Sequence, residues 1–151
     1  MTNEELKTRI LELAPDAMVT DGKQYLEAVI PAGVLHRVAT ALRDDPDTAF
    51  DYLFCLSGVD FPEYIMVYYH LESYRHKHVV VLKVKTDGRD KPKLDTVADI
   101  WPTAGFHERE VYDMFGVTFN GHPDMRRLIL DEGWKYPLLK DYADESRIVE
   151  R

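Results

Sequence analysis

Three runs rich in β-branched and aromatic residues lie close together in the middle of the chain, and they constrain its fold more than any other feature. They are residues 51–56, 64–71 and 78–85, and each has the length and composition of a typical strand. Only the polar residues 72–77 separate the last two runs, which predicts an antiparallel hairpin. We therefore expect a β-sheet at the centre of the fold.

Two helices and a strand are predicted before this sheet region. Thr2 and Glu5 have the spacing of a capping box, which favours a helix that begins there and continues to the apolar residues near position 13. Residues 24–30 have the pattern of a strand after the turn at Asp21 and Gly22. Pro31 then has the position of a first helical residue, and an apolar stripe follows it up to Leu42.

The last third of the chain changes character. A short helix is predicted over residues 95–101 and a longer one over residues 103–115, ended by Gly116 as a left-handed cap. Beyond Gly121 the prolines, glycines and charges indicate an extended arm. The predicted class is α+β, with N-terminal helices packed on a mostly antiparallel sheet, then a helical segment and the arm. We expect residues 1–120 to form one domain and residues 121–151 to dock on a partner.

Composition excludes several functions. The 19 lysines and arginines are outnumbered by 27 aspartates and glutamates, giving a net charge of −8, so nucleic-acid binding is disfavoured. No apolar run approaches the length of a membrane span, and the N-terminus does not resemble a signal peptide, so a soluble protein on the cytoplasmic side is expected.

Cofactor motifs are missing from the sequence. The one cysteine, Cys55, cannot form an internal disulfide or hold an iron–sulfur cluster, and we expect it to be a small buried side chain. Neither the glycine pattern of a dinucleotide fold nor that of a phosphate-binding loop occurs. We expect this chain to bind no metal and no cofactor of its own.

The predicted helix over residues 103–115 contains a carboxylate on its apolar face. Glu108 shares that face with Ala104, Val111 and Phe115, and an ionised carboxylate there needs a cation or several hydrogen-bond donors. A solvated helix would also fit the charge pattern.

Three further charged residues of this helix have candidate partners. Arg109 and Asp113 are spaced to pair along the helix, whereas Arg126 and Arg127 are candidates to bind Glu108 or Glu110.

The segment around His122 allows three interpretations. A turn fits best, because Gly121 gives flexibility, Pro123 fixes φ and Asp124 caps the residues after it. A catalytic pair of His122 and Asp124 is an alternative, although no serine or cysteine nucleophile accompanies it. A metal site is the weakest alternative, because the histidines lack the spacing of ligands.

Taken together, these segments resemble the signature of one family, the 30 kDa-type subunits of the NADH–quinone oxidoreductases, which are also called the C subunits of respiratory complex I. The resemblance extends from about residue 50 to residue 142. It is carried by Glu108, Arg109, Glu110, Asp113, Gly116, His122, Pro123, Asp124, Arg126, Arg127, Pro137, Lys140 and Asp141.

The resemblance implies a scaffold subunit without a redox centre, located peripherally on the cytoplasmic face of the inner membrane. Its partners would be the large quinone-site subunit and the cluster-bearing subunits, which hold FMN and the iron–sulfur clusters that carry electrons from NADH to quinone. The motif residues would form the partner interface rather than a catalytic site, with Glu108 folded against the motif's arginines and with Lys140 and Asp141 reaching the partner.

Two other functions remain open. One is the equivalent subunit of a membrane-bound hydrogenase or of a ferredoxin- or coenzyme F420-dependent complex. The other is a small hydrolase that uses His122 and Asp124.

Overall fold

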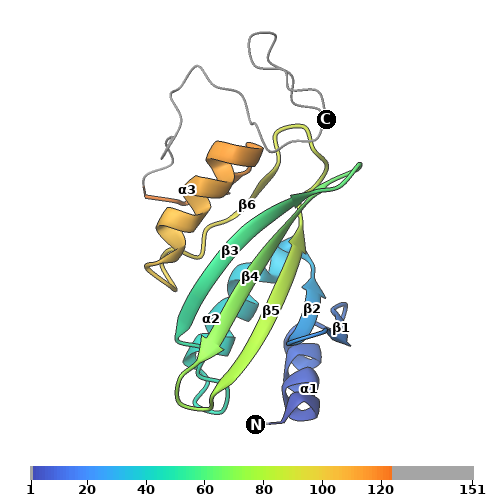
Figure 1. Ribbon diagram of the computed structural model, residues 1–151, viewed down its shortest axis with the longest axis vertical. Helices are drawn as coiled ribbons and strands as arrows, with labels where there is room; N and C mark the ends of the chain where they lie inside the picture. Colours follow the sequence, from blue (N-terminus) through green and yellow to red (C-terminus); the bar gives the residue numbers. More distant parts are fainter. Residues whose placement is uncertain (1, 124–151) are drawn as a thin grey trace.

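A five-stranded sheet forms the centre of the computed structural model, which describes residues 2–123 (Figure 1). The strand order is β1-β2-β5-β4-β3, and β2 and β5 run parallel while the other neighbours are antiparallel. The strands are β1 (Met18–Asp21), β2 (Leu26–Ile30), β3 (Tyr52–Asp60), β4 (Ile65–Ser73) and β5 (His78–Lys85). The predicted mostly antiparallel sheet and its hairpin are confirmed.

One face of this sheet carries the core. In β4 the alternate residues Ile65, Val67, Tyr69 and Leu71 are buried, as the two-residue period of a strand requires. The helices α1 (Asn3–Leu13) and α2 (Leu35–Asp44), the latter entered through a 3₁₀ turn, pack their apolar stripes into the same core. Figure 1 shows α2 behind the strands.

A β-bulge changes the alternation of β3. Its pairing with β4 shifts between Leu53 and Cys55, so that Leu53 and Leu56 both point into the core although three positions separate them. Cys55 is left half-buried. The expectation that Cys55 is a buried core residue is therefore wrong, because the bulge turns it away from the core.

The predicted helix over residues 95–101 is also wrong. Lys93–Asp95 forms the strand β6, which pairs in parallel with β7 (Thr118–Asn120). Only one turn follows, in which the amides of Ile100 and Trp101 both donate to the Val97 carbonyl at 3.0 and 2.9 Å. The Trp101 indole is buried and donates to the Phe50 carbonyl at 2.9 Å, so tertiary packing fixes this segment.

The longer predicted helix is confirmed as α3 (Ala104–Phe115), which lies alongside β3 (Figure 1). Gly116 ends it at φ 80°, a left-handed conformation that glycine adopts without strain. The α+β class is thus confirmed. The predicted C-terminal arm, residues 121–151, lies outside the described residues except for its first three.

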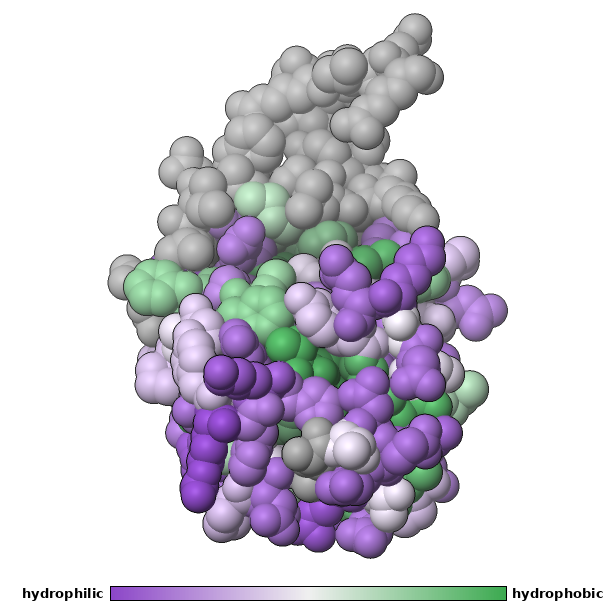
Figure 2. All heavy atoms as spheres, turned by 60° about the horizontal axis from the view of Figure 1, so that its bottom comes forward, coloured by the Kyte–Doolittle hydropathy of each residue, from purple (hydrophilic) through white to green (hydrophobic). Residues whose placement is uncertain are grey.

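One face of the molecule shows how polar and apolar residues are distributed on the surface. Figure 2 shows one face on which hydrophilic residues predominate and apolar side chains gather in the centre. Among the helices of residues 2–123, none has the length and hydropathy needed to cross a membrane.

Candidate functional site

The helix α3 turns its charged residues in two directions. Glu108 and Asp113 are fully buried at 0% exposure, and Ala104, Val111 and Phe115 of the same helix are also buried. Glu110 is exposed, and Arg109 is intermediate between the two. The predicted apolar face containing Glu108 is confirmed. The pairing of Arg109 with Asp113 stays a prediction.

Two hydrogen bonds hold the buried Glu108 carboxylate. The Thr96 hydroxyl donates to Oε1 at 2.5 Å, and the Val97 amide donates to Oε2 at 2.9 Å. Both donors come from the turn after β6, so the carboxylate joins α3 to that turn. The requirement for several donors is met in this way, while Arg126 and Arg127, the predicted partners, lie outside the described residues.

The environment of Glu108 shifts its ionisation strongly. Burial raises the pKa of Glu108 from 4.5 to about 7, against the opposing effect of the hydrogen bonds from Thr96 and Val97, and the charge of Asp99 raises it further. Asp99 itself is bound to His36 of α2, with 2.8 Å between Oδ2 and Nε2, and this bond lowers the pKa of Asp99. Glu108 therefore changes its charge near neutral pH.

His122 also lies close to Glu108, and we call Glu108, Thr96, Val97 and His122 the buried cluster. The Nε2–H of His122 donates to the Gly105 carbonyl at 3.0 Å and lies 3.8 Å from Oε1 of Glu108, and its side chain is only 2% exposed. The His122 amide donates to the Phe119 carbonyl at 3.2 Å, with Gly121 at φ 83°. The predicted turn is confirmed.

A catalytic or metal-binding role for His122 has little support from this geometry. An imidazole so withdrawn from solvent cannot reach a substrate, and Asp124 lies outside the described residues. Within residues 2–123 no three histidine, cysteine or acidic side chains are grouped as metal ligands would be.

Sequence reasoning missed Thr96 and Val97, the two donors to Glu108, and also the buried Tyr69. Thr96 and Val97 fall in the wrongly predicted helix over residues 95–101, so their position in the turn after β6 was not predicted. Tyr69 of β4 is fully buried and its hydroxyl has no hydrogen-bond partner among the described residues. Burial raises the pKa of Tyr69 well above 10, and the charges of Glu108 and Asp95 raise it further. Only the strand alternation, which turns Tyr69 inward, signalled its position.

A small hollow lies between β3 and α3. Its volume is about 140 Å³, and it is lined by Leu56, Ser57, Gly58, Glu110, Val111, Met114 and Phe115. Gly58 lets the helix approach, because a Cβ at this position would lie 2.9 Å from Cδ2 of Phe115. Burial raises the pKa of the nearby Cys55 thiol, and the charge of Glu110 raises it further.

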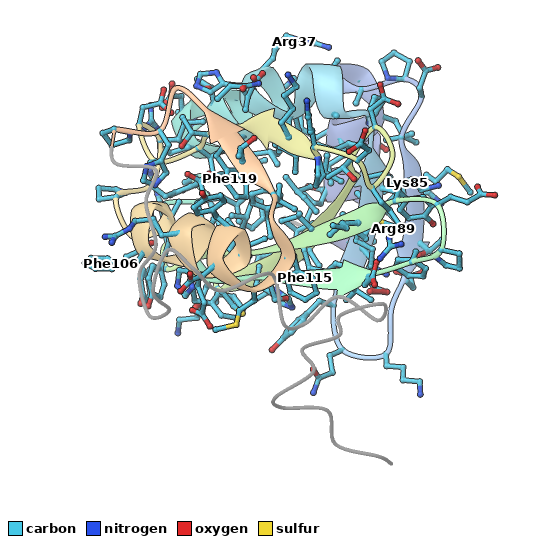
Figure 3. All side chains as sticks on the ribbon, turned by 90° about the horizontal axis from the view of Figure 1, so that it is seen from above. Arg37, Lys85, Arg89, Phe106, Phe115 and Phe119 are labelled. Atoms are coloured by element: carbon cyan, nitrogen blue, oxygen red, sulfur yellow. The ribbon has the colours of Figure 1, made fainter. Side chains whose placement is uncertain are left out.

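The aromatic residues of this region differ in exposure. Figure 3 shows Phe106 projecting away from the body at the beginning of α3, whereas Phe119 lies inside. Their exposed fractions are 66% and 3%. Phe106 is thus an apolar side chain of α3 that the described part of the chain leaves largely uncovered.

Comparison with known protein families supports the sequence resemblance. The model of the family described as "Respiratory-chain NADH dehydrogenase, 30 Kd subunit" matches residues 28–147. A protein of Roseiflexus castenholzii, named as the C subunit of NADH-quinone oxidoreductase, is 35% identical over 148 residues, which cover 93% of this chain and 84% of that protein.

Other relatives are longer than this chain. A protein of Chloroherpeton thalassium with the same C-subunit name is 46% identical over 108 residues, covering 70% of this chain and 45% of that protein. A protein of Phocaeicola vulgatus, named as the C/D subunit of NADH-quinone oxidoreductase, is 48% identical over 119 residues, covering 78% of this chain and 22% of the relative. The match thus spans less than half the length of these two relatives.

A solved structure has the same fold. A chain in the structure of the membrane-bound sulfane sulfur reductase, described as an archaeal respiratory membrane complex, is 31% identical. The TM-score is 0.80, and the alignment covers 95% of this chain and 86% of that one.

Proposed function

Because the chain belongs to the 30 kDa subunit family of the respiratory-chain NADH dehydrogenases, we propose that it is a scaffold subunit in the peripheral arm of a proton-translocating NADH–quinone oxidoreductase. In this role it has no catalytic residue and binds no cofactor. FMN and the iron–sulfur clusters, which carry electrons from NADH to quinone, belong to partner subunits. The chain holds its partners in place.

The division of α3 into an inner and an outer face is the observation that carries this proposal. Glu108, fixed by Thr96 and Val97, anchors the helix inside the domain, while Phe106 and Glu110 on the same helix face outward. A buried carboxylate with matched donors fixes one position of a helix, because any shift leaves the charge unsatisfied. Such an anchored helix presents its outer residues to a partner in a constant orientation.

The rest of the motif extends this interface along the sequence. We assign Asp124, Arg126, Arg127, Pro137, Lys140 and Asp141 to contacts with the large quinone-site subunit and the cluster-bearing subunits. Guanidinium and ammonium groups that pair across an interface give it orientation and specificity. Association with the cytoplasmic face of the membrane then follows through the complex.

A second candidate keeps the scaffold role but changes the complex. The match to a chain of a membrane-bound sulfane sulfur reductase complex, with a TM-score of 0.80, favours an equivalent subunit in a related membrane-bound enzyme, such as a hydrogenase or a ferredoxin- or coenzyme F420-dependent complex. The electron donor distinguishes the two candidates.

Affinity purification of the tagged full chain from its native membranes tests the proposal. We expect a large quinone-site subunit and cluster-bearing subunits to co-purify, identified by mass, and the reduced sample to give iron–sulfur signals by electron paramagnetic resonance. Oxidation of NADH by the purified complex favours the first candidate, whereas activity only with another donor favours the second. A colourless chain recovered alone would contradict both.

A further inference from the structure

The hollow between β3 and α3 continues into a stripe along the helix. Phe106, Glu110 and Met114 are four residues apart and therefore share one helical face. Phe106 is 66% exposed, and Glu110 and Met114 line the hollow. Aromatic and methionine side chains are enriched in protein interfaces. This face of α3 combines such residues with an adjoining concave surface.

The lining of the hollow is mainly apolar, and its polar side chains are those of Ser57 and Glu110. The apolar walls are formed by Leu56, Val111, Met114 and Phe115. The volume of the hollow, about 140 Å³, is close to the ~150 Å³ of an apolar cavity that accepts benzene. Among the described residues Glu110 has no ion-pair partner. The hollow thus has room for one large apolar side chain, with a carboxylate beside it.

We propose that this hollow and the stripe of Phe106, Glu110 and Met114 receive a segment of another subunit, in which an apolar side chain stands next to an arginine or a lysine. The apolar side chain fills the hollow and the cation pairs with Glu110. Docking removes water from this pair, which strengthens its attraction. The inference rests on the proposed function, because it specifies the chemistry of one partner in that assembly.

The net charge of the chain argues for a different protein as the occupant. With a net charge of −8, two copies repel each other, and a second copy would bring a surplus of acidic groups to Glu110. A partner segment that carries a lysine or arginine meets Glu110 with the opposite charge. Charge complementarity therefore selects a basic and apolar segment over a second copy, and the proposed scaffold role assigns that segment to another subunit.

Photo-crosslinking within the assembled complex identifies the occupant. A benzoylphenylalanine placed at position 114 of the tagged full chain is irradiated in native membranes, and the crosslinked peptides are identified by mass. We expect a crosslink to another subunit, at a peptide with a lysine or arginine near an apolar residue. The same probe at position 74, on the hairpin tip where Tyr74 is 61% exposed, is expected to miss that peptide. A crosslink to residues 124–151 of this chain or to a second copy overturns the inference. The absence of any crosslink in an intact complex overturns it as well.

Charge reversal gives an independent test with a matched control. We expect Glu110→Lys to lower the recovery of the crosslinked subunit about tenfold or more, and the exposed Glu63→Lys, with the same change in net charge, to leave it unchanged. The melting temperatures of both purified variants should equal that of the wild type. If Glu110→Lys and the wild type recover the partner equally, the docking site is overturned while the proposed function still stands. Failure of the wild type to recover any other subunit overturns the proposed function as well.

Discussion

The hydroxyl of Thr96 lies 2.5 Å from Oε1 of Glu108 and joins the turn after β6 to α3. The direction of this bond is set by a third group, because the Ala98 amide donates to the same hydroxyl oxygen at 3.1 Å. The single hydroxyl hydrogen is therefore free to point at the carboxylate. The turn after β6 thus orients the Thr96 hydroxyl so that it donates to Glu108 on α3.

The stability of the chain should depend on pH through Glu108. The pKa is 4.5 in an ordinary environment and about 7 in the fold, so between these values the folded state holds a proton that the unfolded state has released. The free energy of unfolding therefore falls as the pH rises through this window and levels off above it.

Glu108→Gln removes this titration. On going from about pH 5 to about pH 8, we expect its free energy of unfolding to rise relative to wild type by about 2–3 kcal/mol. Urea unfolding of both proteins at the two pH values measures the difference. Titrations shared by the two proteins cancel in this comparison, and parallel pH profiles would show that Glu108 keeps an ordinary pKa.

Removing the donor on Thr96 should also destabilise the chain at high pH. Thr96→Val has nearly the same shape but leaves the Glu108 carboxylate with one hydrogen bond, so we expect a loss of about 1–3 kcal/mol in the free energy of unfolding at pH 8. The pKa of Glu108 should also rise. Thr20→Val is the control, since that residue is exposed on β1; an equal loss in both variants would contradict a special role for Thr96.

The close approach of α3 to β3 depends on Gly58. A Cβ there would lie 2.9 Å from the Phe115 ring, so we expect Gly58→Ala to lower the free energy of unfolding by about 1–3 kcal/mol. Phe115→Leu in the same chain should recover part of this loss. Gly33→Ala, where a Cβ would meet nothing within 4 Å, should have little effect. A double variant no more stable than Gly58→Ala would sink the steric explanation.

A buried ion pair fixes the end of β3. Arg89 Nε and Nη2 donate to the two carboxylate oxygens of Asp60 at 2.9 and 3.0 Å, and the Asp60 side chain is 3% exposed. Arg89→Met should cost about 3–5 kcal/mol of stability, because a buried charge is left without this partner. Adding Asp60→Asn to this variant should restore part of the lost stability. Arg37→Met, at an outward-pointing arginine (Figure 3), is the control; thermal unfolding that does not distinguish the two arginines would refute this role.

Two residues outside the described part of the chain are predicted to act in assembly. We expect the replacement of Lys140 and Asp141 by alanine to reduce co-purification of the partner subunits while the melting temperature of the isolated chain stays the same, since we propose that the two side chains contact the partner. Replacement of the exposed pair Asp16 and Lys23 is the matched control. A parallel fall in melting temperature and in assembly would assign the two residues to folding instead.

Sequence patterns predicted the elements whose structure is locally encoded. The strand His78–Lys85 was predicted with its observed bounds, and α3 ends at Gly116 as expected. The burial of Glu108 on the apolar face of α3 also follows from helical spacing. In each case the information lies within a few neighbouring residues.

Local patterns failed where distant residues decide the structure. The helical prediction for residues 95–101 was wrong because Leu94 pairs with Phe119 in β6 and β7, and because the Trp101 indole is buried and donates to the Phe50 carbonyl. The bulge that leaves Cys55 half-buried likewise arises in the pairing of β3 with β4. Both features depend on contacts across the sequence that periodicity does not report.

The sequence by itself determined that a buried carboxylate on α3 would need donors, because an unsatisfied charge in an apolar environment is too costly to persist. Only the tertiary structure decided which groups meet that need. Thr96 and Val97 donate to Glu108, and His122 lies 3.8 Å from it, because β6 and β7 pair and bring two loops close to the helix. Spacing along a chain sets the face on which a residue lies, whereas long-range packing sets what that face touches.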